Sequence, residues 1–205
     1  MERLLSLYAE PYDKRFPVIC IDERPCQLIG DLIVPVAMKP GKARRSDYEY
    51  KRHGVATVFV AIEPLSGKSL MKVTHRRTKQ DYAAFMREVS EHWYEAVQIR
   101  LVQDNLNTHS PSSFYERFEA SAAFALAERF MWYYTPKKGS WLNMAELELS
   151  VLSRQCLDRR IASIEELTTE VAAFSAQRQG VKITWRFTKN DARTKLARHY
   201  PTIQN

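Results

Sequence analysis

The sequence has few of the features that mark several large classes of protein. Of its 205 residues, six are glycine and three are cysteine, and these cysteines (Cys20, Cys26 and Cys156) are scattered. An odd, unpaired set of cysteines favours neither a disulfide framework nor a zinc site, and it fits a reducing compartment. No apolar run is long enough to span a membrane, and no basic-then-apolar leader opens the chain. We therefore expect neither a membrane protein nor a secreted one.

The residues that are present are typical of a folded domain. The chain has 31 Lys and Arg against 24 Asp and Glu, a formal net charge of +7, and 45% of its residues are hydrophobic. Mixed charge with this apolar content excludes intrinsic disorder. The length predicts one large domain with a sufficient core of its own.

The positive surplus is concentrated in one part of the chain. Residues 37–80 contain eleven basic and three acidic residues, a balance of +8, whereas the rest of the chain has a balance of −1. A basic segment attracts polyanions because cations near phosphates release counterions, although a solvated surface would look the same. Tyr48, Tyr50 and His53 interleave with the basic residues, which favours nucleic acid because aromatic rings stack on bases.

The hydrophobic pattern predicts an α/β domain with strands first, then alternating helices and strands, then a helical tail. We expect strands over 17–22, 27–34, 54–62, 70–74, 98–103, 130–134 and 181–187, and helices over 79–96, 112–129, 143–158, 163–178 and 190–198. Residues 39–53 read as a loop or an exposed hairpin. This order predicts a mixed sheet flanked by helices, with parallel strand–helix–strand units from 70 to 134.

Two acids follow predicted strands. Asp22 ends the first strand and Asp104 follows the strand 98–103, and ligands gather at the carboxyl ends of parallel strands. Each acid also has a plainer interpretation: Asp22 as the partner of a base or a turn cap, and Asp104 as a loop residue that bonds its own backbone. The functional interpretation makes Asp104 a metal ligand supported by Asn105 and His109. Glu23 should point to the face opposite Asp22.

A third acid lies at the start of the helix predicted over 143–158. Glu146 can form a capping box with Asn143, and it can also point towards a metal. Glu148 competes with it, because two residues on a helix are about 200° apart and only one of them can join a site. The periodicity leaves this choice open. Three carboxylates without convincing His or Cys partners favour a hard ion such as Mg²⁺.

These residues lie in three ordered blocks that match a known family. The blocks are Val18-Ile-Cys-Ile-Asp22-Glu23, then Leu101-Val-Gln-Asp104-Asn105-Leu-Asn-Thr-His109, then Tyr134-Thr-Pro-Lys-Lys-Gly-Ser140-Trp-Leu-Asn143-Met-Ala-Glu146. Together with linking segments such as Arg76-Arg-Thr-Lys79, the chain resembles the insertion sequence 630 type transposases, bacterial relatives of the Tc/mariner superfamily. The resemblance covers nearly the whole chain.

The resemblance implies an RNase H-like fold with a helical C-terminal extension and a DDE site made of Asp22, Asp104 and Glu146. These acids would be both the catalytic residues and the ligands of two Mg²⁺ ions, for which Mn²⁺ can substitute. Asn105, His109 and Asn143 would support the acids or contact the cleaved strand. The implied activity is cleavage at transposon ends and transfer of the cut strand into target DNA.

The resemblance also implies partners and a location. The partner is double-stranded DNA, bound by a homodimer in the bacterial cytoplasm. The residues expected to bind DNA are Lys39, Lys42, Arg44, Arg45, Lys51, Arg52, Arg76, Arg77, Lys79, Lys137 and Lys138. The alternatives are a DNA-binding remnant without catalysis and a generic RNase H-like nuclease.

Two features depart from the family pattern. The stretch between Asp104 and Glu146 is longer than in many members, and we expect the extra length in the 110–129 region. We also expect residues 1–205 to form a single catalytic domain, because the helix-turn-helix domains that precede it in full-length relatives do not fit before Pro17.

Overall fold

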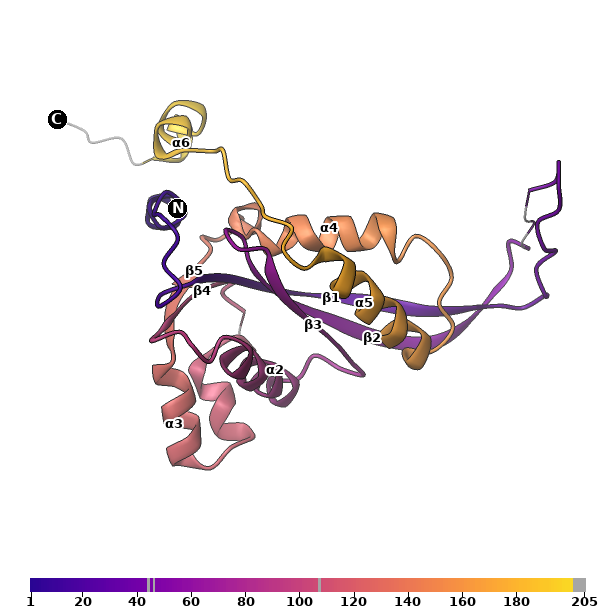
Figure 1. Ribbon diagram of the computed structural model, residues 1–205, viewed down its shortest axis with the longest axis horizontal. Coiled ribbons are helices and arrows are strands. Elements are labelled where there is room, and N and C mark those ends of the chain that lie inside the picture. Colours follow the sequence, from indigo (N-terminus) through magenta and orange to yellow (C-terminus); the bar gives the residue numbers. More distant parts are fainter. Residues whose placement is uncertain (44, 46, 107, 201–205) are drawn as a thin grey trace.

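The computed structural model describes residues 1–43, 45, 47–106 and 108–200, without the side chain of His199. A five-stranded mixed sheet forms its centre, with the strand order β3-β2-β1-β4-β5 (Figure 1). The strands are β1 (Val18–Asp31), β2 (Tyr50–Glu63), β3 (Lys68–Thr74), β4 (Ile99–Gln103) and β5 (Phe130–Tyr134). The α-helices are α1 (Glu2–Tyr8), α2 (Lys79–His92), α3 (Ala120–Glu128), α4 (Ala145–Gln155), α5 (Ile164–Arg178) and α6 (Lys189–Lys195). Short 3₁₀ turns are η1 (Pro111–Glu116), η2 (Ser140–Leu142) and η3 (Ala197–His199).

The predicted mixture of parallel and antiparallel strands is confirmed. β1 pairs with β2, and β2 with β3, in antiparallel ladders, whereas β1–β4 and β4–β5 are parallel. After two reversals β3 runs in the same direction as β1, but it lies at the far edge of the sheet. The parallel part that carries the acids is therefore β1, β4 and β5.

The predicted strands 17–22 and 27–34 are one continuous strand, so their separation was wrong. The polar residues around Pro25 break the hydrophobic pattern, yet the ladder continues there, with Pro25 opposite Thr57. Proline is tolerated at this point because β4 pairs with β1 only over Val18–Cys20, which leaves the rest of β1 as an edge strand. A register shift lies between Leu28 and Ile29.

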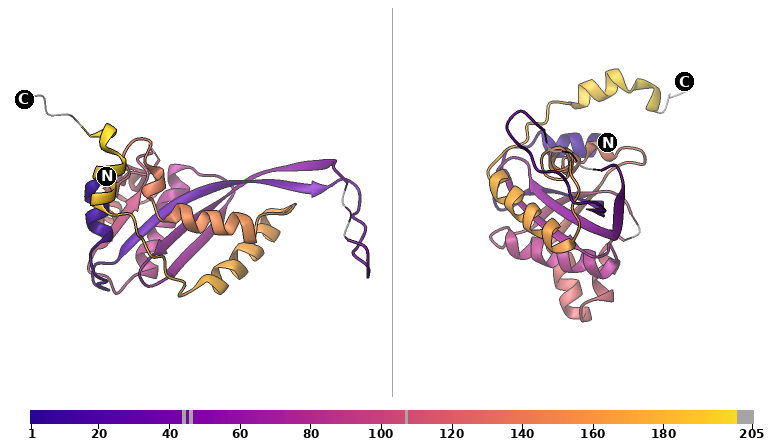
Figure 2. Two further views of the ribbon diagram at one scale, coloured as in Figure 1. Left: turned by 90° about the horizontal axis from the view of Figure 1, so that it is seen from above. Right: turned by 90° about the vertical axis from the view of Figure 1, so that its right-hand side faces the viewer.

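Helices cover both faces of the sheet (Figure 2). Odd-numbered residues of β1, such as Ile19 and Ile21, pack against α2 and α3 in one core cluster. The even-numbered residues Val18 and Cys20 pack on the other face, where α1 and the start of α4 lie. This alternation is the period of two expected for a buried strand. No helix in the described residues has the length and apolar character needed to cross a lipid bilayer.

Two other expectations need correction. The helix predicted over 112–129 is divided into η1 and α3, and the Ser113 hydroxyl, which donates to the Thr108 carbonyl, holds η1 against the preceding loop. The segment 181–187 is extended but forms no strand. Its alternation reflects packing instead, because Ile183, Trp185 and Phe187 cover the core beside α1 and α4.

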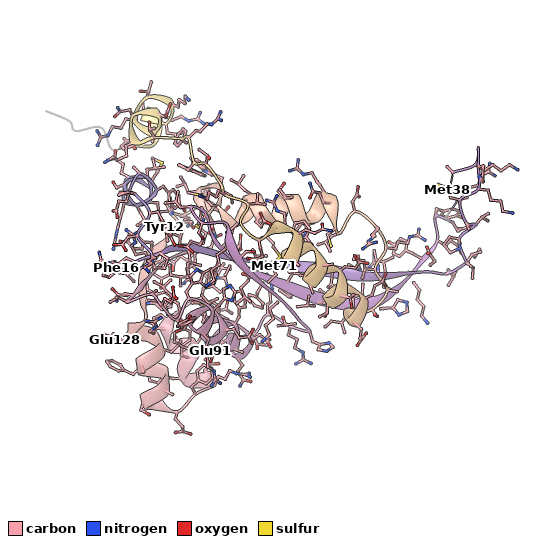
Figure 3. The ribbon with its side chains drawn as sticks, viewed as in Figure 1. Tyr12, Phe16, Met38, Met71, Glu91 and Glu128 are labelled. Carbon is pink, nitrogen blue, oxygen red and sulfur yellow. The ribbon has the colours of Figure 1, made fainter. Side chains whose placement is uncertain are left out.

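The exposed hairpin is confirmed, and it is long. β1 and β2 continue beyond the helices as a projecting arm, whose described end comprises residues 32–43, 45 and 47–49 (Figure 1). Isolated bridges Val36–Arg45 and Lys39–Lys42 close its tip. Met38, which is 75% exposed, lies at its far end (Figure 3).

Candidate active site

Asp22 lies in β1 and Asp104 directly follows the neighbouring parallel strand β4, and both continue the same face of the sheet. Cys20 is opposite Val102 in the β1–β4 ladder, and two residues further along the chain from each are Asp22 and Asp104. Cys20 and Val102 both belong to the core cluster beside α1 and α4. Because strand side chains alternate, the two acids continue that face. Glu23 continues the opposite face, as the sequence predicted.

The environment of Asp22 disfavours its charged form. Burial, followed by the negative charges of Glu146, Glu23 and Asp104, raises the pKa of Asp22 to about 7, against a backbone hydrogen bond from Glu23 that lowers it. Both other acids of the predicted triad therefore act electrostatically on Asp22. A carboxyl pKa raised by burial and by neighbouring carboxylates is typical of a functional site. Bound cations would offset the repulsion between the carboxylates.

Asp104 is held in place by the next strand. The Thr135 hydroxyl donates to Asp104 Oδ1 at 2.7 Å, and the Thr135 amide donates to the Gln103 carbonyl. Beside them is a surface pocket whose lining includes Asp104, Asn105, Lys137, Lys138 and Ser140. The exposed Asn105 and both lysines thus share this pocket with the second acid.

A tight turn presents the two lysines. The Gly139 amide donates to the Pro136 carbonyl, and Lys138 has the left-handed φ of 62°. A Cβ on Gly139 would lie 2.6 Å from Pro136 Cγ, so glycine is required at this close approach.

Asn143 ties the third acid to the first strand. The buried Asn143 side chain donates from Nδ2 to the Ile21 carbonyl at 2.7 Å, and its Oδ1 accepts from the Ala145 amide. The helix α4 begins at Ala145, with Met144 and not Asn143 as its N-cap and with no side-chain cap. The expected capping box is therefore absent from this helix start. Asn143 instead anchors the first turn of α4, which carries Glu146, to the residue that precedes Asp22.

Glu148, the other candidate for the third acid, has a separate role. Its side chain is 1% exposed, and both of its oxygens accept from Arg178 of α5, at 3.0 and 2.8 Å. Glu146 is exposed on the opposite side of the helix and acts on the pKa of Asp22. The helical periodicity could not choose between these two acids, whereas the structure gives them different surroundings: Glu148 is buried against Arg178, and Glu146 is exposed.

His109 lies beneath the site, on the face opposite the acids. Its ring is 3% exposed and stacks on Tyr82 with centroids 4.7 Å apart, and its Nε2 is 3.1 Å from Glu23 Oε2. The Gln103 side chain donates to the His109 carbonyl and accepts from the Tyr82 hydroxyl. These contacts fold the loop after Asp104 back onto β1, so the contacts of His109 are with Glu23 and Gln103.

The described residues include no group of three His, Cys, Asp or Glu side chains placed so that together they could hold a metal ion. The donor types nevertheless suit a hard cation, because the side chains that raise the pKa of Asp22 are all carboxylates. Occupation by a metal would require Asp22, Asp104 and Glu146 to draw closer than they are here.

The predicted DNA-binding residues fall into three places rather than one. Lys39, Lys42, Arg45, Lys51 and Arg52 lie on the arm, and Arg44 lies outside the described residues. The second group is at the β3–α2 junction, where Arg76 is exposed, Arg77 lies 3.8 Å from Glu23 and Lys79 pairs with Glu116. Lys137 and Lys138 line the pocket beside Asp104. The tip of the arm, where Met38 lies, projects away from the body of the protein (Figure 3), so residues 37–80 are not a single patch.

The raised pKa of Asp22 predicts a pH-dependent cost to stability. The folded chain holds the Asp22 proton up to about pH 7, whereas the unfolded chain releases it near the usual value of 3.8. Folding therefore takes up a proton in this window, and stability falls as pH rises through it. With a chelator present, we expect Asp22→Asn to gain unfolding free energy relative to the natural chain as pH rises, by at most about 1.4 kcal/mol per pH unit. Urea unfolding at several pH values measures this. A difference that stays constant across the window would contradict it.

Comparison with known proteins supplies the family. A family model described as "DDE superfamily endonuclease" matches residues 17–168, which is most of the chain, and the chain belongs to this family. The crystal structure of the Mos1 mariner paired end complex with Mn has a TM-score of 0.59 at 14% identity, over 87% of this chain and 53% of that chain. The Mos1 Strand Transfer Complex has a TM-score of 0.54 at 13% identity, over 85% and 51%.

The structural matches confirm the RNase H-like fold. This chain spans about half the length of the Mos1 chains. No curated protein sequence matches it significantly.

The contacts that sequence reasoning missed join residues far apart in the chain. Thr135 is 31 residues from Asp104, and Arg178 is 30 from Glu148. The contact between Thr135 and Asp104 could have been found from the β4–β5 register. Gln103 is opposite Tyr134, so the next pair along the two segments is Asp104 and Thr135. For Arg178 no local signal existed.

Proposed function

We propose that this chain is the catalytic domain of a DNA transposase of the insertion sequence 630 type. It cuts DNA at the ends of a mobile element and joins the cut strand to target DNA. Asp22, Asp104 and Glu146 are its catalytic acids and its metal ligands. The observation that carries the proposal is the arrangement of these acids: Asp22 and Asp104 continue one face of the adjacent parallel strands β1 and β4, and Glu146 lies on a helix whose first turn is anchored to β1.

The electrostatics agree with this assignment. Glu146 and Asp104 both raise the pKa of Asp22, so the three side chains share one local field although long stretches of sequence separate them. Glu148, the competing acid, is already neutralised by Arg178. The family match and the RNase H-like fold support a nuclease that acts by phosphoryl transfer.

The protein's own groups have distinct tasks in this reaction. Divalent cations such as Mg²⁺, when bound, supply charge neutralisation and activation of the attacking oxygen. Asp22 releases its proton as the site takes up positive charge. Thr135 and Asn143 hold the second and third acids in place, while Lys137 and Lys138 bind phosphates beside Asp104. No covalent bond between enzyme and DNA is required.

The arm and the β3–α2 junction would contact DNA further from the cleaved bond. Lys39, Lys42, Arg45, Lys51 and Arg52 of the arm are exposed, as binding to a polyanion requires. We further propose that the DNA complex is a homodimer, because two element ends are processed together. The chain would then act as one domain in a larger assembly.

Purified protein incubated with duplex DNA that carries the element's own end tests the function. We expect strand cleavage that requires Mg²⁺ or Mn²⁺ and leaves a 3′-hydroxyl, followed by joining of that strand to a plasmid. Products are resolved on denaturing gels. Cleavage of RNA–DNA hybrids but not of duplex DNA would indicate an RNase H-like nuclease instead. Binding without any cleavage, with the sequence-recognition part supplied, would indicate a non-catalytic remnant.

A further inference from the structure

The C-terminal segment carries a second concentration of positive charge, which the total hides. Residues 181–200 contain six basic residues (Lys182, Arg186, Lys189, Arg193, Lys195 and Arg198) and a single acid, Asp191, a balance of +5. Removing this +5 and the +8 of residues 37–80 from the net +7 leaves −6 for the rest of the chain. The apparent neutrality outside residues 37–80 is thus an average of one basic segment and an acidic remainder.

The fold turns the cations of this segment outward. Along 181–187 the chain alternates, so that Ile183, Trp185 and Phe187 pack on the core while Lys182 and Arg186 are exposed. Within the part of the chain that the structure describes, neither of these two cations forms an ion pair. They are therefore available to an external anion.

The segment is fixed to the body of the protein. A capping box between Thr188 and Asp191 starts α6, and Arg193 of α6 forms two hydrogen bonds with Glu2 of α1, both of 2.8 Å. Figure 1 shows α6 beside the N-terminal helix. An anchored basic surface loses less conformational entropy on binding than a free tail.

An aromatic side chain joins this surface to the active site. Trp141 is 45% exposed, and its ring lies nearly parallel to that of Trp185, at 17° and a centroid distance of 6.4 Å. It also meets Phe187 edge-on at 5.3 Å. Trp141 belongs to the η2 turn, directly after Ser140 of the Asp104 pocket and two residues before Asn143.

We propose that Trp141 and the segment 181–198 form a second DNA-binding surface next to the catalytic acids. Lys182 and Arg186 contact backbone phosphates, and the exposed part of the Trp141 indole stacks on an unpaired base near the cleaved bond. Positive charge with an exposed ring backed by other rings is the combination that binds unpaired nucleotides. This inference rests on the proposed function, since it assumes a DNA substrate.

Binding without catalysis tests it. Fluorescence anisotropy, with a chelator present, compares a blunt DNA duplex with the same duplex bearing an unpaired 3′ overhang. For Lys182→Ala/Arg186→Ala we expect weaker binding to both, and a plot of log affinity against log salt that is shallower by about 2. The matched control is Lys14→Ala/Arg117→Ala, which removes the same charge from exposed positions elsewhere and should keep the slope.

Trp141→Ala should lose about tenfold or more in affinity for the overhang duplex and little for the blunt one, and Trp141→Tyr should restore most of the loss. Equal losses on both duplexes, or no rescue by tyrosine, would show a merely structural role for the ring.

An unchanged salt slope in Lys182→Ala/Arg186→Ala would show that these two side chains do not contact DNA phosphates. If the natural chain binds neither duplex, the proposed function itself fails; if it binds both and the variants match the control, only this inference fails.

Discussion

Asp22→Asn, Asp104→Asn and Glu146→Gln should each reduce cleavage of element-end DNA by about 10³-fold or more while the protein stays folded. Each replacement removes one negative oxygen donor from a site that must gather cations, and such cations contribute substantially to transition-state stabilisation. A loss of about 1.4 kcal/mol of that stabilisation slows a reaction tenfold. The three losses should not add, because the acids act as one unit. Single-turnover cleavage with Mg²⁺ in excess measures them.

The matched control is Glu128→Gln. Glu128 is exposed at the end of α3 (Figure 3). This helix packs on the face of the sheet opposite to Asp22 and Asp104, and the replacement removes the same charge. We expect its cleavage rate to stay near that of the natural chain. Near-natural cleavage by Asp22→Asn, Asp104→Asn or Glu146→Gln would exclude that acid from the catalytic set. If Glu148→Gln lost catalysis and Glu146→Gln kept it, Glu148 and not Glu146 would be the third catalytic acid.

The parts of the fold that follow local patterns were predictable. β-branched runs indicated the strands, and the alternation of apolar residues along β1 predicted the opposite orientations of Asp22 and Glu23. The prediction that Asp22 ends its strand was wrong, because β1 continues to Asp31. The parallel pairing of β1 with β4 nevertheless ends at Cys20, so Asp22 and Asp104 both lie just beyond the parallel pairing, where ligands were expected. The prediction that failed was the division of β1 into two strands. The polar residues around Pro25 look like a break between strands, although an edge strand accepts a proline.

The parts that depend on distant partners were not predictable. The pattern of the 181–187 segment is that of a strand, but its hydrogen bond to the body is made by Ile183 to Pro64 and its side chains complete a core instead of a ladder. Asn143 reads as a helix cap, yet its amide bonds to Ile21, 122 residues earlier. Local sequence encodes the capacity of a polar side chain to bond, whereas the fold decides its partner.

The choice between Glu146 and Glu148 shows this dependence most directly, and it predicts a large effect on stability. Arg178 is the partner that neutralises the buried Glu148 carboxylate, so Arg178→Ala should leave that charge uncompensated. We expect the free energy of unfolding to fall by roughly 3 kcal/mol, the lower end for a buried pair because the Arg178 side chain is 21% exposed. Urea unfolding measures it, and the folded fraction should still cleave DNA.

Two variants separate the loss of the pair from the loss of an arginine. Arg154→Ala removes an exposed arginine of the same helix as Glu148 and should change stability by no more than about 0.5 kcal/mol. Glu148→Leu combined with Arg178→Leu removes both charges, so the buried carboxylate no longer needs a partner, and most of the stability should return. If the double variant were as unstable as Arg178→Ala, the packing of the Arg178 stem and not the buried charge would hold α5 against α4. If Arg178→Ala were as stable as the natural chain, water would reach Glu148, and its exclusion from the catalytic site on grounds of burial would no longer stand.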